Sequence, residues 1–199
     1  MKRTGSTLAA LAAAAVLGTG SAFAADSPLL VRVGAHNVDP KSDNTDIGVS
    51  VDSRLGPTFN IDWYFTPHLA LDILAALPFK HDLTANGDKI GSATHLPPTV
   101  SLQYHFAPGG RIDPYVALGV NYTMFWDTKL DDGTALDLDN SFGLAGQIGV
   151  DFAVAPKWVV GADLRYIDID TDADIGNGAV KTTVEIDPLV YGINVGYRF

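Results

Sequence analysis

The chain ends in the eleven-residue segment Leu189–Phe199, whose sequence is LVYGINVGYRF. Its odd positions hold leucine, tyrosine, isoleucine, valine and phenylalanine, whereas the even positions after Val190 hold glycine, asparagine and arginine. A period of two places these two sets on opposite faces of a β-strand. Eleven residues is also about the length that a tilted strand needs to cross a bilayer. The segment therefore predicts a membrane-spanning strand.

The same alternation recurs upstream in seven further segments: residues 29–36, 58–65, 69–77, 99–106, 115–124, 141–152 and 158–166. Short connections (66–68, 107–114 and 153–157) alternate with long ones (about 37–55, 82–98, 127–140 and 168–188). Short periplasmic turns and longer extracellular loops are typical of outer-membrane barrels. We therefore expect an all-β fold, an eight-stranded antiparallel transmembrane barrel over residues 25–199, with both termini on the periplasmic side and no second domain.

The placement of aromatic residues predicts which face of the barrel meets lipid. Aromatic side chains on the apolar face gather near the short turns (Trp63, Phe65, Phe106, Phe152, Trp158, Phe199) and toward the long loops (Tyr122, Trp126, Phe142, Tyr166). Two such girdles are typical of membrane interfaces. A soluble lipocalin-like barrel would instead turn its apolar face inward and a charged face outward. The pattern favours apolar side chains on the outside.

Composition excludes several other classes of protein. The 199 residues include no cysteine, so the chain has no disulfide framework and no thiolate metal site. A formal net charge of −10 argues against a nucleic-acid partner. Glu185 is the one glutamate among 23 acidic residues, and aspartate favours turns over helices.

The first 24 residues, Met1–Ala24, predict a cleaved signal peptide. Lys2 and Arg3 form the charged start, residues 8–17 form the apolar stretch, and residues 22–24 read Ala-Phe-Ala, a cleavage site. The alternatives are a membrane anchor or a buried helix, but the apolar run is well short of the ~20 residues that a spanning helix needs. Export to the Gram-negative envelope follows from this prediction.

Four segments resemble the outer membrane protein W (OmpW) family: residues 95–99 (HLPPT), 113–122, 163–170 and 196–199 (GYRF). The resemblance covers essentially the whole mature chain. It implies a monomeric eight-stranded barrel in the outer membrane, associated with passage of small hydrophobic molecules that differ between members. Phe199, with the aromatic Tyr197 two residues earlier, resembles the signal read by the outer-membrane assembly machinery.

Inward-facing positions divide by height into two groups. Near the short turns they carry charges that we expect to pair into a polar plug, because unpaired buried charges cost several kcal/mol. The predicted plug residues are Arg32, Asp62, Asp72, Asp151, Asp163, Arg165 and Arg198. Toward the long loops the inward positions become apolar and predict a mouth lined by Leu74, Ala76, Pro78, Phe125, Ile167 and Ile169.

This arrangement suggests that hydrophobic solutes enter the mouth, are stopped by the plug and leave sideways into the bilayer. Sideways exit needs weakened strand pairing, and proline removes a ladder hydrogen bond. Pro57, Pro78, Pro97 and Pro98 all lie at the loop-side ends of neighbouring strands. The alternative is that these prolines merely end the strands.

The residues also permit two other functions. The first is a structural or host-interaction barrel with a plugged lumen and functional loops. The second is a lipid-modifying enzyme, which the residues support less: His105 and Ser101 lie too far apart on one strand, and the chain has no G-x-S-x-G elbow. We expect no enzyme activity, no cofactor and no resident metal.

An acidic segment and two histidines lie in the regions expected as loops. Asp168, Asp170, Asp172 and Asp174 lack the glycine and glutamate of an EF-hand loop. Divalent ions bridging Asp168 and Asp170 to lipopolysaccharide phosphates are one reading, and a solvated acidic loop is the other. His81 and His95 are expected as loop or rim residues, and a β-bulge is expected near Pro188, where the alternation loses its phase.

Overall fold

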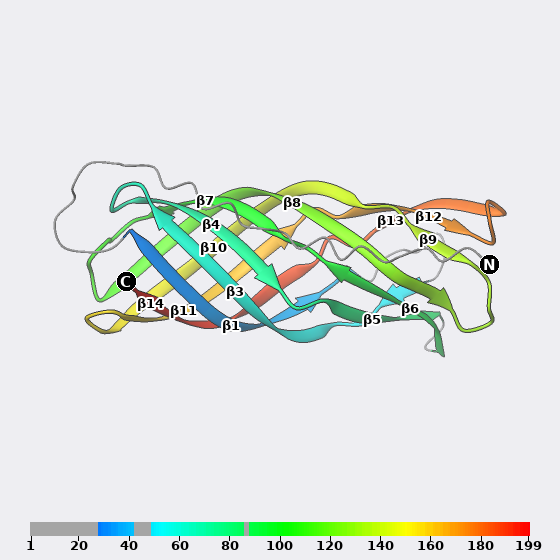
Figure 1. Cartoon of the computed structure of the whole chain (residues 1–199), viewed down its shortest axis with the longest axis horizontal. Helices are drawn as coiled ribbons and strands as arrows, with labels where there is room; N and C mark the ends of the chain where they lie inside the picture. Colours follow the sequence, from blue (N-terminus) through cyan, green and yellow to red (C-terminus); the bar gives the residue numbers. More distant parts are fainter. Residues whose placement is uncertain (1–27, 42–48, 86–87) are drawn as a thin grey trace, which may run out of the picture.

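The computed structural model describes residues 28–41, 49–85 and 88–199, and the predicted signal peptide Met1–Ala24 lies outside them. Eight antiparallel strands form a barrel (Figure 1). In order around the wall they are β1 (Leu29–Asp39), β3 (Arg54–Tyr64), β4 (Leu69–Ala76), β7 (Thr99–His105), β8 (Ile112–Leu130), β10 (Ser141–Ala155), β11 (Trp158–Ile167) and β14 (Leu189–Arg198). The first and last strands pair from Leu30↔Arg198 to Asp39↔Leu189, which closes the wall. The predicted eight-stranded barrel is confirmed.

Burial alternates along the wall because successive side chains point to opposite faces. Strand β7 alternates without a break, with Thr99, Ser101, Gln103 and His105 buried and the residues between them exposed. The outer face is apolar: Leu118 is 78% exposed and Phe142 69%. The inner face is polar, with Asp62 and Asp72 fully buried. Such a distribution suits lipid outside and an enclosed polar core.

The exposed apolar belt has an aromatic edge at each end. Trp63, Phe106 and Trp158 mark the edge near the short turns, and Tyr122, Phe142 and Tyr166 mark the other, all with exposed side chains. We take the wall between these rings as the membrane-spanning part. Among the described residues, no helix is long and apolar enough to cross a membrane.

Six short strands extend the molecule beyond one end of the barrel (Figure 1). Strands β2 (Val49–Val51), β5 (Phe79–Ala85) and β6 (Asp88–Leu96) continue the main sheet alongside the far half of β8. Strands β9 (Leu136–Leu138), β12 (Asp170–Ile175) and β13 (Val180–Glu185) form a separate three-stranded sheet. The sequence predicted long loops here. That prediction is wrong, since these connections form paired strands. In β5 and β6, register shifts at Leu83/Thr84 and Ser92/Thr94 break the period of two.

The β-bulge predicted near Pro188 is also absent from the described chain. Instead the strand conformation is interrupted between β13 and β14, where Asp187 has a φ of 34°. Strand β13 pairs with β12, and the amide of Ile186 donates to the carbonyl oxygen of Ile169 at 2.9 Å. The loss of phase in the sequence therefore marks a change of sheet.

Candidate functional site

Arg32 forms the centre of the polar plug inside the barrel. Its Nε donates to Asp62 at 2.6 Å, and its Nη1 and Nη2 donate to the two oxygens of Asp151 at 2.6 and 2.7 Å. Nη1 also donates to Asn194 Oδ1 at 3.2 Å. A guanidinium suits this position because its planar fork binds a carboxylate with two parallel hydrogen bonds. Strands β1, β3, β10 and β14 are thereby tied together across the lumen.

A second ion pair and a polar cluster lie above this centre. Arg165 donates to Asp72 at 2.9 Å, and Asn60 donates to the other oxygen of Asp72 at 2.7 Å. Asp163 lies 3.0 Å from His36 Nε2 and accepts from Gln147 at 3.0 Å. Six of the seven predicted plug residues thus take part in hydrogen bonds across the interior.

Arg198, the seventh predicted plug residue, lies apart from these ion pairs. Its guanidinium carbon lies 4.4 Å from the centroid of the Tyr64 ring, and Tyr64 in turn is 3.2 Å from His105. The uncharged partners Asn60, Asn194 and Gln147 were missed in the sequence. Their inward position beside charged residues was the feature of the sequence that would have identified them.

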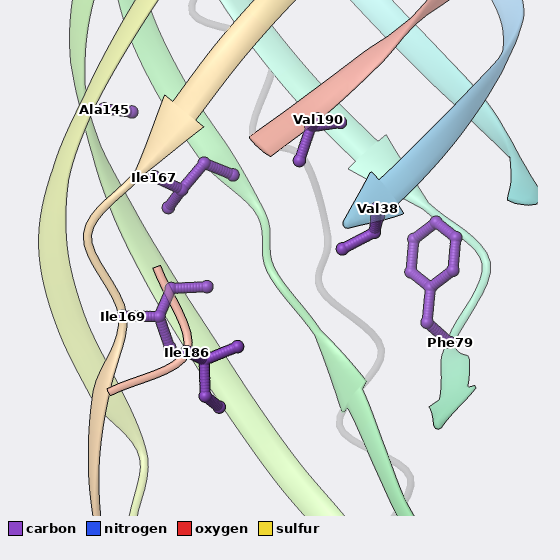
Figure 2. Packing of buried hydrophobic residues seen from close by; sticks show 7 residues of the cluster. All are labelled: Val38, Phe79, Ala145, Ile167, Ile169, Ile186 and Val190. Atoms are coloured by element: carbon purple, nitrogen blue, oxygen red, sulfur yellow. The ribbon is translucent and has the colours of Figure 1, made fainter. Parts of the chain in front are cut away.

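The inner face of one wall changes from polar to apolar with height. Along β11 and into β12, successive inward positions are Asp163, Arg165, Ile167, Ile169 and Thr171. Ile167 and Ile169 belong to a buried apolar layer that caps the plug. Its members are Val38, Phe79, Ala145, Ile167, Ile169, Ile186 and Val190, and Figure 2 shows their side chains meeting from opposite walls.

Above the apolar layer, the extension strands line a partly open cavity of about 110 Å³. Its lining is made of Val51, His81, Leu83, Ile90, Ala93, His95, Phe125, Leu130, Leu136, Leu138, Thr171, Ala173, Ile175, Val184 and Ile186. Nearly all of these side chains are apolar, so the cavity suits an apolar molecule of about the size of one benzene ring. Most lining residues fall in segments predicted as loops. The apolar residues in those segments were the feature of the sequence that would have indicated a buried lining there.

The predicted mouth residues are distributed unevenly around this cavity. Ile167 and Ile169 are in the apolar layer, Ala76 packs against it, and Phe125 both packs against it and lines the cavity. Leu74 is buried but belongs to neither set. Pro78 is exposed, which contradicts its predicted inward position. It precedes β5, where the chain leaves the barrel wall and the inward-outward parity of β4 no longer applies.

His81 and His95 were expected as loop or rim residues, but both are buried in the cavity wall. Their ring centroids lie 4.7 Å apart, and both rings pack near Phe79. His81 Nδ1 lies 2.6 Å from the carbonyl oxygen of Asp52. Burial lowers the pKa of His81, and burial beside His81 lowers the pKa of His95 to about 3. Both rings are therefore neutral near pH 7.

The remaining sequence-predicted residues lie on the outer surface. Asp168 and Asp170 are joined by Asp187 in a group whose carboxylate oxygens lie within 4.8 Å of one another, whereas Asp172 accepts a hydrogen bond from Thr183. Tyr197 packs its ring against Trp158 and Phe199, each at 5.0 Å between centroids. The bridging of lipopolysaccharide and the assembly signal stay predictions.

Comparison with known proteins agrees with this architecture. The model of the OmpW family matches residues 25–199. Outer membrane protein W of Escherichia coli (strain K12) is 36% identical over 212 residues, covering 97% of this chain and 98% of that protein. The crystal structure of the outer membrane protein OprG from Pseudomonas aeruginosa has a TM-score of 0.76 and 33% identity, covering 87% of this chain and 97% of that one.

A further relative has a name that refers to metabolism. It is the "Dibenzothiophene metabolism operon protein PahQ" of Pseudomonas aeruginosa, 30% identical over 118 residues, which cover 58% of this chain and 56% of that protein. The closed barrel, its apolar belt and the match over nearly the full length confirm the resemblance seen in the motifs. The chain belongs to the OmpW family and is a β-barrel of the Gram-negative outer membrane.

Proposed function

We propose that this barrel passes small hydrophobic solutes from the outside of the cell into the outer membrane. The observation that carries the proposal is an apolar cavity placed above a lumen filled by paired charges. PahQ supports it, since its name links a relative to the metabolism of an aromatic sulfur heterocycle. The cavity end is extracellular in this proposal, and both chain ends of the barrel are periplasmic.

The plug makes straight passage through the lumen unfavourable. A hydrophobic solute cannot replace the hydrogen bonds among Arg32, Asp62 and Asp151, and separating these charges in a narrow interior costs several kcal/mol. An eight-stranded barrel has an interior that side chains nearly fill. The solute therefore needs an exit above the plug.

The wall between β4 and β7 offers such an exit. Within the described residues, the β4–β7 ladder ends at Leu74↔Thr99, and pairing resumes only at Phe79↔His95 between β5 and β6. Pro78 on one side and Pro97 and Pro98 on the other lie in this interruption. Proline donates no backbone hydrogen bond, so the gap stays without a ladder.

Phe79, the first residue of β5, packs its ring against the neighbouring strand β3 at the side of this interruption. The β3–β4 ladder ends at Thr58↔Ala76, and beyond it the ring of Phe79 packs on Gly56, where a Cβ atom would collide with the ring. Phe79 also belongs to the apolar layer under the cavity (Figure 2). We infer that movement of this ring opens the way from the cavity to the lipid.

A disulfide staple tests lateral exit directly, because the chain has no cysteine of its own. The double variant Leu74→Cys, Thr99→Cys joins the last pair below the interruption, whereas Thr123→Cys, Ser141→Cys joins a pair between β8 and β10 as the matched control. Uptake of p-xylene into proteoliposomes is measured with the thiols oxidised and then reduced. We expect oxidation to slow uptake only in the first variant.

Two outcomes would contradict the proposal. Equal uptake by the oxidised and reduced forms of the first staple would argue against an exit that widens between β4 and β7. Uptake by wild-type proteoliposomes no faster than by protein-free liposomes would favour the rival reading, a structural barrel whose function lies in its extracellular segments.

A further inference from the structure

Two acidic side chains of the plug, Asp62 and Asp72, lie directly against each other. They are opposite residues in the β3–β4 ladder, and both are fully buried on its inner face. Opposite residues on one face of an antiparallel pair have Cβ atoms about 4.5–5.5 Å apart, so their side chains meet. The two carboxyl groups are within hydrogen-bonding reach of each other. Two ionised carboxylates in this position would repel each other strongly, because the interior screens charge poorly.

One of the four carboxyl oxygens of this pair lacks a hydrogen-bond donor. Asp72 accepts from Asn60 at 2.7 Å on one oxygen and from Arg165 at 2.9 Å on the other. Oδ2 of Asp62 accepts from Nε of Arg32 at 2.6 Å. Oδ1 of Asp62 accepts from no described residue, although it has almost no surface that a water molecule could reach. An ionised carboxylate only accepts hydrogen bonds, so an ionised Asp62 would leave this buried oxygen unsatisfied.

The charges around the pair are also out of balance. Arg32 and Arg165 are shared by three carboxyl groups, those of Asp62, Asp72 and Asp151. Arg32 directs both of its Nη atoms at Asp151 and has only Nε left for Asp62. Two guanidinium groups neutralise two carboxylates, which leaves one negative charge in excess. A buried charge without a counterion is strongly unfavourable.

The other ionisable groups of the plug do not supply the missing positive charge. Among the described residues, none of them forms an ion pair with Asp62 or Asp72. They have partners elsewhere: His36 with Asp163, His105 with Asp113, and Arg198 with the ring of Tyr64.

We propose that Asp62 carries a proton on Oδ1 and donates it in a hydrogen bond to Asp72, so that the pair holds one negative charge. The proton belongs to Asp62 because both oxygens of Asp72 already accept from other donors, and each can accept once more. This single proton satisfies the unpaired oxygen and removes the excess charge. It joins β3 to β4 inside the lumen and thereby helps to hold the plug closed. The proposal concerns the plug alone and does not depend on the route of a solute.

Infrared spectroscopy of the full-length mature barrel in detergent at pH 6 detects the proton directly. An exposed aspartate is ionised at that pH, so the carbonyl band of a protonated carboxylic acid reports a buried one. We expect wild type to show this band and Asp62→Asn to lack it. Asp137→Asn, at an exposed position on β9, is the control and should keep the band.

Urea unfolding of two asparagine variants provides an independent measurement. Asparagine resembles a protonated aspartate, because its amide N–H can donate to Asp72 while its oxygen accepts from Arg32. We therefore expect Asp62→Asn to keep its urea midpoint within about 0.5 M of wild type. Asp151→Asn places an amide N–H against the guanidinium N–H groups of Arg32, so its midpoint should fall by about 1 M or more.

Three results would overturn the proposal. If wild type shows no band of a protonated carboxylic acid, both members of the pair are ionised. If the band is present and Asp62→Asn keeps it, the proton lies on another residue. If Asp62→Asn loses as much stability as Asp151→Asn, or does not fold, Asp62 acts as an ionised partner of Arg32 in the same way as Asp151.

Discussion

Arg32 shows how much a single residue contributes to closing the lumen, because it compensates two buried carboxylates at once. Arg32→Met would leave Asp62 and Asp151 buried without their cation, so we expect a loss of about 3–5 kcal/mol in the free energy of unfolding. Arg32→Lys keeps the positive charge but loses the planar guanidinium, so its free energy of unfolding should lie between those of wild type and Arg32→Met. Urea unfolding in detergent, followed by the shift between folded and unfolded bands on unheated gels, measures this.

The control for Arg32 is Lys41→Met. Lys41 lies 3.6 Å from Glu185, with both side chains about half exposed, and such surface pairs contribute about 0–1 kcal/mol. If Arg32→Met lowers the free energy of unfolding as little as Lys41→Met does, the charges of the plug are in contact with water in the lumen.

The two cavity histidines predict a dependence of stability on pH. Burial lowers the pKa of His81, and that of His95 to about 3, whereas histidine in an unfolded chain titrates near 6.5. Between these values the unfolded chain binds protons that the folded chain does not, so stability falls as pH drops below about 6.5. Above that pH the two residues add no pH dependence.

Urea midpoints at pH 7.5 and 5.0 test this in wild type and in the double variant His81→Phe, His95→Phe. We expect the double variant to lose less stability on acidification, since it lacks the two groups that the unfolded chain would protonate. His36 and His105 in the plug are common to both proteins and cancel in the comparison. Equal losses in the two proteins would show that neither ring resists protonation.

At the scale of elements, strand β10 contains two glycines with opposite roles. Gly143 lies beside the chain that continues after β11, and a Cβ atom there would collide with the backbone carbonyl of Asp168, whose amide donates to the carbonyl oxygen of Leu144 at 2.8 Å. Gly146, on the same strand, has open space at its Cβ position. The first glycine therefore permits a close approach of two backbones, and the second does not need to be glycine.

We expect Gly143→Ala to lower the free energy of unfolding by about 1–3 kcal/mol, through overpacking against backbone that cannot rotate away. Gly146→Ala should be neutral or stabilising by up to about 1 kcal/mol, since alanine loses less backbone entropy on folding. The two urea midpoints are compared in the same detergent. Similar effects for both variants would mean that the chain after β11 does not pack on Gly143.

At the scale of the whole molecule, the apolar belt makes a prediction that a soluble barrel would not. Leu118, midway along the spanning part of β8, is 78% exposed. In water, Leu118→Arg would change stability little, whereas on a lipid face near the bilayer midplane it costs about 2–4 kcal/mol. Ala179→Arg, at an exposed position outside the belt, serves as the control and should stay within about 0.5 kcal/mol.

Unfolding titrations in phospholipid vesicles separate the two cases. Equal stability of Leu118→Arg and Ala179→Arg in vesicles would contradict the membrane orientation. The same experiment in short-chain detergent should give a smaller loss for Leu118→Arg, because a micelle deforms more easily around a charge than a bilayer does.

The sequence alone determined the number of barrel strands and their inward and outward faces, because a period of two is local and each strand records it independently. The family followed from short motifs such as residues 95–99. Charges at inward positions such as Arg32 and Asp62 were identifiable for the same reason, although their partners Asn60 and Asn194 were not. Tertiary structure alone decided the cavity, since it gathers side chains from β2, β5, β6, β8, β9, β12 and β13 across register shifts that erase the alternation. The pairing of His81 with His95 depends on such contacts between segments, and no local pattern encodes a contact that forms only when distant strands meet.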